Sequence, residues 1–430
     1  MASVLLPFSS SLEESAVKEG FRICIHTKGS RFDSGIQGKQ LRVISDNPRA
    51  LQAWCKTDRV LPHKISPRFY FVPHANPTVK PRGPVPYFNM NQIRSIYAIP
   101  APKQPYVVGV VSFGGGLYGS VSAEGLLTNG DVQAYWSALG IPAANHPRVI
   151  VVPILGAKNA PSMNDMGYTF ENTLDVETVG GACPSSNLTI ILYIAPNRLS
   201  AFPDLLNYMY STTITVGDIP YKPNLISCSW GAPEIYYSAS LRSSIDSILA
   251  KINAAGINMC AATGDNGSND GVGGRGNYVD FPSSHPYVLA VGGTTLVCPT
   301  GVYDSKTKET AWSSGGGGIS VAYSKPSYQT AAWGRSTPDI ACIADPNTGV
   351  VFIINGRAYV IGGTSVASPV MAGYLAAINY KKWIHPNLYK AKNGFHDVTG
   401  GSNGGYSAKA GYDNCTGLGS VNGAVLSSFL

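Results

Sequence analysis

A serine at the start of an apolar, helix-like stretch is the first group in this sequence that could do chemistry. Ser365 lies in GGTSVASPVMAG, residues 362–373, directly after two glycines. The small apolar residues that follow, 366–379, predict a buried helix. Pro369 is expected in its first turn, where a proline is tolerated. Backbone N–H groups and the helix dipole would stabilise an anion beside Ser365, so this residue is either a nucleophile or a cap of a core helix.

A serine nucleophile needs a base within hydrogen-bonding distance, usually a histidine that is oriented by a carboxylate. None of the seven histidines lies in the H-G-T-H context that accompanies a G-T-S-x-x-x-P serine in subtilisins. His285 and His396 are interpreted as turn or surface residues. The sequence therefore argues against an ordinary Ser-His-Asp triad.

Two carboxylates offer an alternative base. Glu171 and Asp175 lie in YTFENTLDVETVG, residues 168–180, and their i, i+4 spacing puts both on one face of a helix. Repulsion between neighbouring carboxylates lets them share a proton and raises one pKa above its ordinary value. Such a pair could take the proton of a serine at acidic pH. The competing interpretation is a solvated acidic face, of which Glu177 is the expected example.

A third carboxyl, Asp265, follows an apolar strand in CAATGDNGSNDG, residues 260–271. If it stays protonated, it could donate a hydrogen bond to the oxyanion of a tetrahedral intermediate. Otherwise it is a turn residue.

A possible peptide-binding edge lies in SWGAPE. The backbone of Ser229, Trp230 and Gly231 could pair with an extended peptide, as β-augmentation requires. The four glycines 315–318 would permit close backbone approach on the other side. Trp230 could instead simply fill the core.

The hydrophobic pattern predicts the elements that position these residues. Short apolar runs such as YVVGVVSF, RVIVVPIL and NLTIILYIA alternate with helical stretches such as SLRSSIDSILAKINAAG. This alternation indicates an α/β fold with a doubly wound, mostly parallel sheet flanked by helices. Functional residues should lie at the carboxyl ends of the strands. A proline-rich linker, 73–86, separates a small N-terminal extension, so the expected domains are 1–84 and 85–430.

Composition excludes several classes of protein. The chain has 430 residues, 44% of them hydrophobic, and its excess of 32 Lys and Arg over 25 Asp and Glu is dispersed, which argues against a nucleic-acid partner. No apolar run approaches the roughly 18 residues that span a bilayer, and the N-terminus lacks the features of a signal peptide. Cys228, Cys260 and Cys342 lie in apolar runs and are expected to be buried thiols. No C-x-x-C spacing suggests zinc.

The motifs, taken in order, resemble the sedolisins, which are serine-carboxyl peptidases with a subtilisin-like fold. The resemblance runs from VPYFNMNQIRSIYAIP at residue 85 to the C-terminus and includes SWGAPE, FPSSHPYVLAVGGTTL, AWSSGGGGISVAYSKPSYQ and STPDIACIADPNTGV. It implies an acid-acting peptidase that cleaves polypeptides through an acyl-enzyme. By that resemblance Ser365 is the nucleophile, Glu171 the base, Asp175 its supporting acid and Asp265 the oxyanion-hole carboxyl. We expect a monomer.

The resemblance also implies one structural calcium ion. The stretch FHDVTGGSNGGYSAKAGYDNCTG, residues 395–417, resembles the sedolisin calcium site. The matching ligands are the carboxylates of Asp397 and Asp413 and the carbonyls of Val398, Lys409 and Gly411. Calcium takes about six or more oxygen ligands, and glycine-rich loops can supply backbone carbonyls. Composition alone would favour a polar surface loop.

Two departures from the family pattern matter. Ser112, in VVSFGGG, stands where some relatives carry an acidic residue, so the carboxylate network is expected to be shorter. Residues 1–84 are shorter than the usual prosegment and could be a reduced prosegment or an unrelated extension.

The rival hypothesis is a catalytically silent relative that binds peptides in the same groove. An α/β-hydrolase esterase is disfavoured because Ser365 lacks a G-x-S-x-G context. The compartment stays open, although family members are often secreted or found in acidic compartments.

Overall fold

The structure is a computed structural model that describes residues 87–430 except 103–104, 165, 273–275, 331–332 and 392. Before residue 87 it describes the backbone of five strands: β1 (Ala2–Pro7), β2 (Arg22–Thr27), β3 (Lys39–Ser45), β4 (Ser66–Pro67) and β5 (Tyr70–Pro73). β1, β3 and β2 form an antiparallel sheet of their own, whereas β4 and β5 pair with strands of the larger unit. Apart from Pro73, the expected linker at 73–86 lies outside the described residues.

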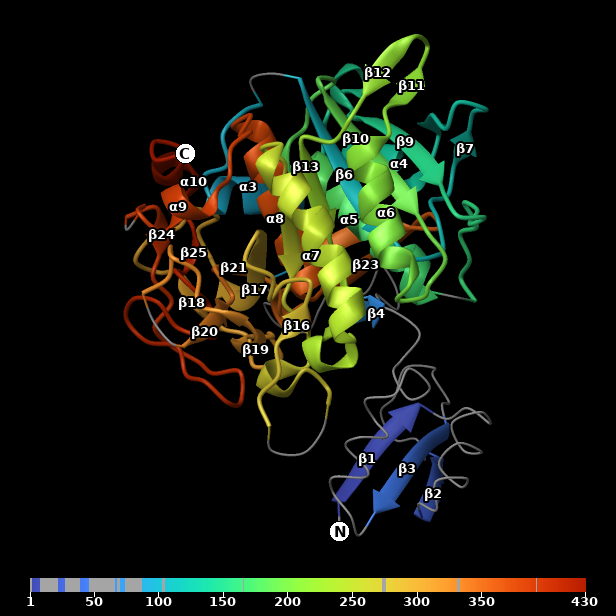
Figure 1. Cartoon of the computed structure of the whole chain (residues 1–430). Helices are drawn as coiled ribbons and strands as arrows, with labels where there is room; N and C mark the ends of the chain where they lie inside the picture. The colour runs from blue at the N-terminus through green and yellow to red at the C-terminus, as the bar shows by residue number, and fades with distance from the viewer. Residues whose placement is uncertain are drawn as a thin grey trace.

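A ten-stranded sheet forms the centre of the larger unit, in the order β24-β25-β21-β17-β15-β13-β6-β10-β9, with β18 paired to β17 (Figure 1). Its strands are β6 (Tyr106–Ser112), β9 (Arg148–Pro153), β10 (Leu188–Ile194), β13 (Leu225–Cys228), β15 (Asn258–Ala262), β17 (Val288–Val297), β18 (Lys308–Ala311), β21 (Ile340–Ile343), β24 (Phe395–His396) and β25 (Ser420–Val421). All neighbours run parallel except β24/β25 and β17/β18. The predicted mostly parallel sheet is confirmed.

Helices cover both faces of this sheet. One face packs against α3 (Met90–Ile96), α4 (Asp131–Ala138), α5 (Met166–Ala182) and α8 (Thr364–Ala377), and the other against α6 (Ala201–Ser211) and α7 (Ala239–Ala254). Figure 1 shows α6 and α7 in front of the sheet. Because successive strand residues point to opposite faces, Cys260 and Leu289 join the first core, and Met259 and Val288 join the second. The strands are therefore apolar along their whole length, which is what made them recognisable in the sequence.

Shorter elements surround the sheet. They are β7 (Ser120–Val121), β8 (Leu127–Thr128), β11 (Ile214–Val216), β12 (Ile219–Tyr221), β14 (Trp230–Pro233), β16 (Asp280–Phe281), β19 (Gly318–Ser324), β20 (Gly334–Thr337), β22 (Val350–Ile354), β23 (Arg357–Gly362), α9 (His385–Leu388) and α10 (Gly423–Leu426). β14 and β23 matter most for the site, because β23 leads into α8, β14 begins next to a residue that contacts Ser365, and the two strands pair with β4 and β5.

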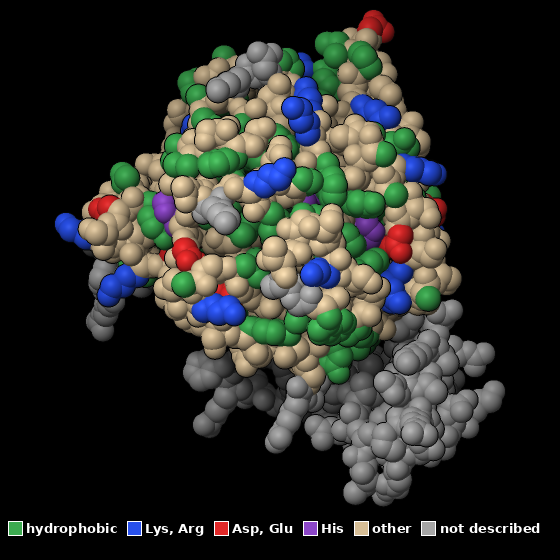
Figure 2. Space-filling model, turned by 60° about the vertical axis from the view of Figure 1, so that its left-hand side comes forward, with side chains coloured by type: hydrophobic (Ala, Val, Ile, Leu, Met, Phe, Trp, Pro, Cys, Tyr) green, Lys and Arg blue, Asp and Glu red, His purple; other side chains and the backbone are tan. Residues whose placement is uncertain are grey.

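The distribution of surface charge and the burial of three cysteines match the expectations from the sequence. On the face drawn in Figure 2, Lys and Arg side chains are scattered rather than gathered into a patch. A search of the described residues finds no helix with the length and apolarity to cross a membrane. Cys228, Cys260 and Cys342 are buried free thiols, as predicted.

Candidate active site

The glycine pair before Ser365 shapes the entry into α8. Gly363 has a φ of 123°, a conformation that residues with a Cβ rarely adopt. A Cβ on Gly362 would lie 2.3 Å from the carbonyl oxygen of Ala344. Both glycines are therefore required locally, and they place Ser365 in the first turn of α8. The predicted helix is confirmed, although it starts at Thr364, slightly before the expected 366–379.

Pro369 lies in the second turn of α8 and not in the first, so that prediction is wrong. Proline has no N–H to donate to the carbonyl four residues earlier, which is that of Ser365. This carbonyl lies 3.4 Å from Ser229 Oγ instead, and Ser365 Oγ lies 3.4 Å from the carbonyl of Ser229. The proline thus leaves Ser365 free to contact the junction between β13 and β14.

Helix α5 brings Glu171 and Asp175 beside Ser365. The two helices touch closely, because a Cβ on Gly373 of α8 would lie 2.4 Å from the Cβ of Ala182 in α5. Both carboxyls are fully buried, and Ser229 Oγ donates to Asp175 Oδ1 at 2.6 Å. The predicted pairing of the two carboxyls on one helical face is therefore present in the structure.

Burial sets the protonation of this pair. It raises the pKa of both carboxyls well above their ordinary values, and repulsion by Asp175 raises the pKa of Glu171 further. The hydroxyls of Ser365 and Ser229 act in the opposite direction on the pKa of Glu171. Neither oxygen of Glu171 makes a hydrogen bond of normal geometry to a described residue. Such a pair holds a proton at pH values where exposed carboxyls have lost theirs.

One prediction about solvent exposure is wrong. Glu177 was expected on a solvated face, but it is fully buried and Oε2 accepts a hydrogen bond from the backbone N–H of Ile353 at 3.1 Å. Every residue of α5 from 169 to 182 is buried, so this part of the helix has no solvated face. His285 lies in a turn before β17, as predicted, and is only 3% exposed.

Asp265 follows the carboxyl end of β15 and faces the start of α8. Its Oδ1 accepts two hydrogen bonds of 2.8 Å, from the backbone N–H and the hydroxyl of Thr364. Gly316, one of the four glycines at 315–318, packs against the end of β15, since a Cβ on Gly316 would lie 1.8 Å from the carbonyl oxygen of Thr263. The close backbone approach that was expected of these glycines therefore brings Gly316 against the end of β15. Thr364, which the sequence analysis overlooked, could have been found from its place between the glycine pair and the serine.

Ser229, Trp230 and Gly231 lie where β13 ends and β14 begins. The Trp230 side chain is 1% exposed and stacks on Tyr168 with ring centres 5.6 Å apart, so it does fill the core. The backbone of β14 pairs antiparallel with β4, Trp230 opposite Pro67 and Gly231 opposite Ser66. The edge that was expected to take an extended peptide thus carries a strand from the N-terminal extension.

Ser229 has a second role that the sequence did not suggest, because its hydroxyl orients Asp175. Ser112, the position where relatives were expected to extend the carboxylate network, is buried and donates to the carbonyl of Gly114 at 3.0 Å.

The C-terminal residues expected to bind calcium lie around one loop. The N–H of Gly411 donates to Asp397 Oδ2, and the N–H of Lys409 donates to Asp413 Oδ2, both at 2.9 Å. Asp413 Oδ1 also accepts from the N–H groups of Cys415 and Thr416 at 2.8 Å. The described residues hold no metal-binding group of three or more His, Cys, Asp or Glu. The expected ligands are two carboxylates and three carbonyls including that of Val398, an all-oxygen donor set that suits a hard cation.

Comparison with known proteins is consistent with this geometry. Residues 155–392 match the Subtilase family, Peptidase_S8. Kumamolisin from Bacillus sp. (strain MN-32) is 35% identical over 349 residues, which cover 74% of this chain and 59% of kumamolisin. Sedolisin from Pseudomonas sp. (strain 101) is 31% identical over 356 residues, which cover 75% of this chain and 57% of sedolisin. The chain thus matches less than two thirds of the length of these relatives.

A solved structure gives the same answer for the fold. Pseudomonas sedolisin, described as a serine-carboxyl proteinase complexed with two molecules of pseudo-iodotyrostatin, is 28% identical to this chain. It aligns with a TM-score of 0.67 over 81% of this chain and 98% of the sedolisin chain. The expected subtilisin-like fold is confirmed, and the chain belongs to the Subtilase family and, within it, to the sedolisins.

Proposed function

We propose that this chain is an acid-acting serine-carboxyl peptidase that hydrolyses polypeptides through an acyl-enzyme on Ser365. The observation that carries the proposal is the meeting of Ser365 with the buried carboxyls of Glu171 and Asp175, while Asp265 binds the residue before the serine. The similarity to kumamolisin and to a sedolisin described as a serine-carboxyl proteinase supports it. Such an enzyme would act as a monomer, either secreted or in an acidic compartment.

In the proposed reaction Glu171 takes the proton of Ser365 as Oγ attacks the peptide carbonyl. The hydroxyl first rotates away from the carbonyl of Ser229 toward Glu171. Asp175, oriented by Ser229 Oγ, shares protons with Glu171 and holds it in place. When the tetrahedral intermediate collapses, the proton on Glu171 passes to the leaving amine. Water then attacks the acyl-enzyme, with Glu171 again accepting a proton.

The oxyanion is stabilised at the start of α8. The backbone N–H of Ser365 is one of the helix's first donors, which have no partner within the helix, and the helix dipole adds positive potential there. Asp265 supplies the second donor. Since its Oδ1 already accepts two hydrogen bonds from Thr364, its proton is assigned to Oδ2, which donates to the oxyanion.

A fluorophosphonate probe tests this proposal against a silent peptide-binding relative. Folded protein from which the N-terminal extension has been removed should be labelled at Ser365 near pH 4, where the carboxyls hold their shared proton. Ser365→Ala should abolish labelling, and Ser368→Ala, a buried serine of the same helix, should not. A persistent lack of labelling in folded wild-type protein would favour the silent relative.

We further propose that residues 1–84 belong to a prosegment that blocks the substrate groove. β4 pairs with Trp230 and Gly231, and β5 pairs with β23, with Tyr70 opposite Gly362. β23 leads directly into α8, and Ser229, just before β14, contacts Ser365. Antiparallel backbone pairing is also how an extended peptide adds to a sheet edge. The same edge, from Ser229 to Gly231, would therefore bind substrate once β4 has left.

One structural calcium ion is proposed in the C-terminal loop. The carboxylates of Asp397 and Asp413 and the carbonyls of Val398, Lys409 and Gly411 would hold it. The ion takes no part in the reaction; when bound it stabilises the folded loop.

A further inference from the structure

A second cleft opens far from the catalytic serine, where α7, the turn before β17 and the end of β19 meet. It has a volume of about 560 Å³, and the lining side chains that matter are Asp246, His285, Tyr287, Tyr323, Tyr328 and Trp383. Its position follows from β17. Tyr287 precedes this strand, whereas a Cβ on Gly293 within the strand would lie 3.3 Å from Thr364. At about 3.3 Å per residue, the two positions are roughly 20 Å apart, so the cleft is separate from the catalytic groove.

Asp246 gives this cleft an oriented negative charge. Its Oδ1 accepts a hydrogen bond of 2.6 Å from the hydroxyl of Tyr323 and lies 3.4 Å from His285 Nε2. His285 Nδ1 accepts the backbone N–H of Tyr287 at 3.1 Å, so the ring proton is on Nε2 and points to Asp246. Both contacts use Oδ1, and the Asp246 side chain is 38% exposed. The carboxylate is therefore held in one orientation while remaining accessible.

The charge of Asp246 is not cancelled inside the cleft. Burial and the nearby Arg335 lower the pKa of His285 to about 3, so this imidazole is neutral. Partial burial raises the pKa of Asp246, whereas the hydrogen bond from Tyr323 and the charge of Arg242 act in the opposite direction. Arg242 lies one turn earlier on α7, and its guanidinium donates to the carbonyls of Glu234 and Tyr237. Among the described lining residues, Asp246 is the one that carries a charge near neutral pH.

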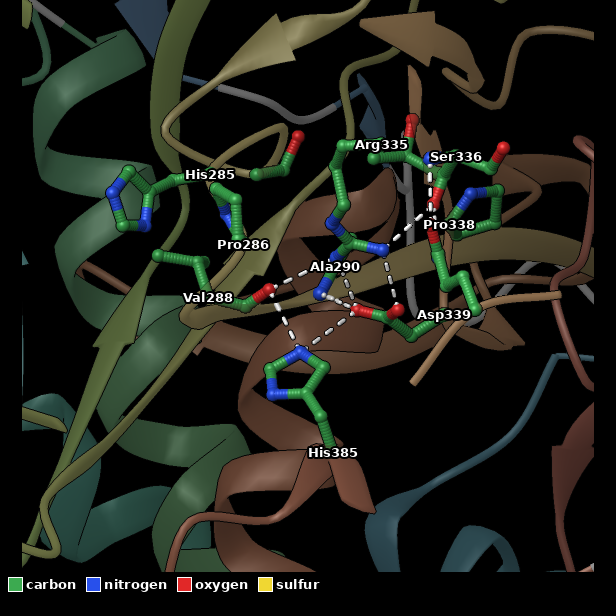
Figure 3. A network of polar contacts seen from close by, with 12 residues as sticks. His285, Pro286, Val288, Ala290, Arg335, Ser336, Pro338, Asp339 and His385 are labelled. Atoms are coloured by element: carbon green, nitrogen blue, oxygen red, sulfur yellow. Dashed lines mark hydrogen bonds and ion pairs between the residues drawn. The ribbon is translucent and has the colours of Figure 1, made fainter. Parts of the chain in front are cut away.

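A buried network behind the cleft fixes part of its aromatic wall. Arg335 and Asp339 form a fully buried ion pair with two contacts of 2.6 Å, and His385 Nε2 lies 3.3 Å from Asp339 Oδ2. Figure 3 shows Arg335 and His385 converging on Asp339, whereas the ring of His285 points away from them. Arg335 is paired with Asp339, and its guanidinium carbon lies 5.8 Å from the centre of the Tyr328 ring, on the buried side of the cleft wall.

Two aromatic rings of the cleft are anchored to that network. The indole N–H of Trp383 donates to His385 Nδ1 at 3.0 Å. The ring of Tyr328 lies 4.6 Å from that of His385, and its hydroxyl donates to the carbonyl of Pro286 at 2.6 Å. These rings therefore keep their positions without a ligand, and such preorganisation lowers the entropy lost on binding.

We propose that this cleft binds an organic cation, specifically an alkylammonium group. Aromatic faces attract cations through the ring quadrupole, and the attraction is strengthened when the site is partly desolvated. Tyr287, Tyr323, Tyr328 and Trp383 supply the aromatic rings that line the cleft, and Asp246 supplies the counter-charge. The group could belong to a free amine or to a lysine side chain of a bound polypeptide. The proposal does not depend on the peptidase activity.

Calorimetric titration of the full chain carrying Ser365→Ala, which prevents hydrolysis, tests the proposal near pH 7. n-Butylammonium should bind at a single saturable site, and the neutral isostere n-butanol should bind at least about fivefold more weakly. Asp246→Asn should weaken n-butylammonium binding by about fivefold or more. The matched control is Asp204→Asn, which changes an exposed carboxylate on α6 and should have no effect.

The proposal is overturned if no saturable binding occurs, if n-butanol binds equally well, or if Asp246→Asn binds like the parent chain. Should circular dichroism show that Asp246→Asn does not fold, Tyr287→Leu, which removes one aromatic face, must weaken n-butylammonium binding instead. The source of the group is decided by the peptide acetyl-Gly-Lys-Gly-amide. Binding about tenfold tighter than n-butylammonium assigns the cleft to a polypeptide lysine, and equal binding assigns it to a free amine.

Discussion

The proposed chemistry depends on proton transfer between Ser365 and the carboxyl pair of Glu171 and Asp175. Ser365→Ala or Glu171→Gln should reduce peptide hydrolysis to less than about a tenth of the wild-type rate, because each removes a group that moves the proton. The fold should survive, since neither change leaves a large void. Rates of peptide-library cleavage measured across acidic to neutral pH would show this, and wild-type activity should fall toward neutral pH.

The matched control for that experiment is Glu177→Gln. Glu177 is as deeply buried on the same helix, but it contacts the backbone of Ile353 and not Ser365. This variant should remain active. Glu171→Gln protein that keeps more than about a tenth of the activity would exclude Glu171 as the base.

Glu171 should also make stability depend on pH. Burial raises its pKa in the folded state, so the folded chain holds a proton that the unfolded chain loses above about pH 4. Stability from this group is present below that pH and is lost as pH rises through the higher folded pKa. The Glu171→Gln variant, whose side chain stays neutral, should therefore have a higher free energy of unfolding than its parent near pH 7, by about 1.4 kcal/mol per unit of difference between the folded and unfolded pKa. Near pH 3 the two proteins should be nearly equal in stability.

Urea unfolding in a Ser365→Ala background, where autolysis is prevented, would measure the effect. A stability difference that is the same at both pH values would contradict a raised pKa of Glu171.

Among the elements, those with a strong local pattern were predictable. Apolar strands and intervening helices predicted the parallel sheet, and the i, i+4 spacing of Glu171 and Asp175 placed both on one face of α5. That Glu177 is also buried could not be read from the same stretch, because it depends on the other elements that pack around α5. Pro369 was predicted in the wrong turn of the helix because the helix begins at Thr364, two residues earlier than expected.

The C-terminal loop gives a prediction at the element scale. If Asp397 and Asp413 bind calcium, removing the ion leaves two carboxylates around residues 409–411 without their counter-charge, and the loop becomes less stable. EDTA should lower the melting temperature of wild-type protein, and Asp413→Ala should remove that sensitivity. Asp204→Asn, far from the loop in sequence, should keep it. An unchanged wild-type melting curve, with no calcium found in protein never exposed to chelator, would exclude the site.

For the whole molecule, the proposed prosegment predicts self-processing. Acidification should cut the chain in or near the proline-rich linker at residues 73–86, because β4 and β5, which precede it, pair with β14 and with β23, the strand that leads into α8. Mass spectrometry of the purified protein would identify the new N-terminus. Ser365→Ala trimmed as fast as wild type would rule out self-processing, and an uncut chain with full activity would show that the segment does not inhibit.

The long-range pairings that motivate this experiment could not be predicted from the sequence. β4 is two residues long and carries no pattern that distinguishes it from a loop. Its partner lies in β14, more than a hundred residues along the chain, and only the folded structure brings the two together. The cleft that we propose to bind an alkylammonium group could not be predicted either, because its lining comes from four separate segments of the chain.

The pairing of β4 and β5 has a kinetic consequence. A strand tethered to the same chain competes with substrate at an effective concentration that is commonly in the millimolar range, whatever the protein concentration. If these strands block the groove as proposed, a peptide substrate of similar affinity at micromolar concentration would be outcompeted, and diluting the protein would not relieve the block. Cutting the tether converts the competitor into a separate peptide, which can then be lost by dilution. Cleavage would thus change inhibition from an intramolecular to an intermolecular binding event. Activation would be complete when the enzyme is at nanomolar concentration, and adding back the released segment would reverse it.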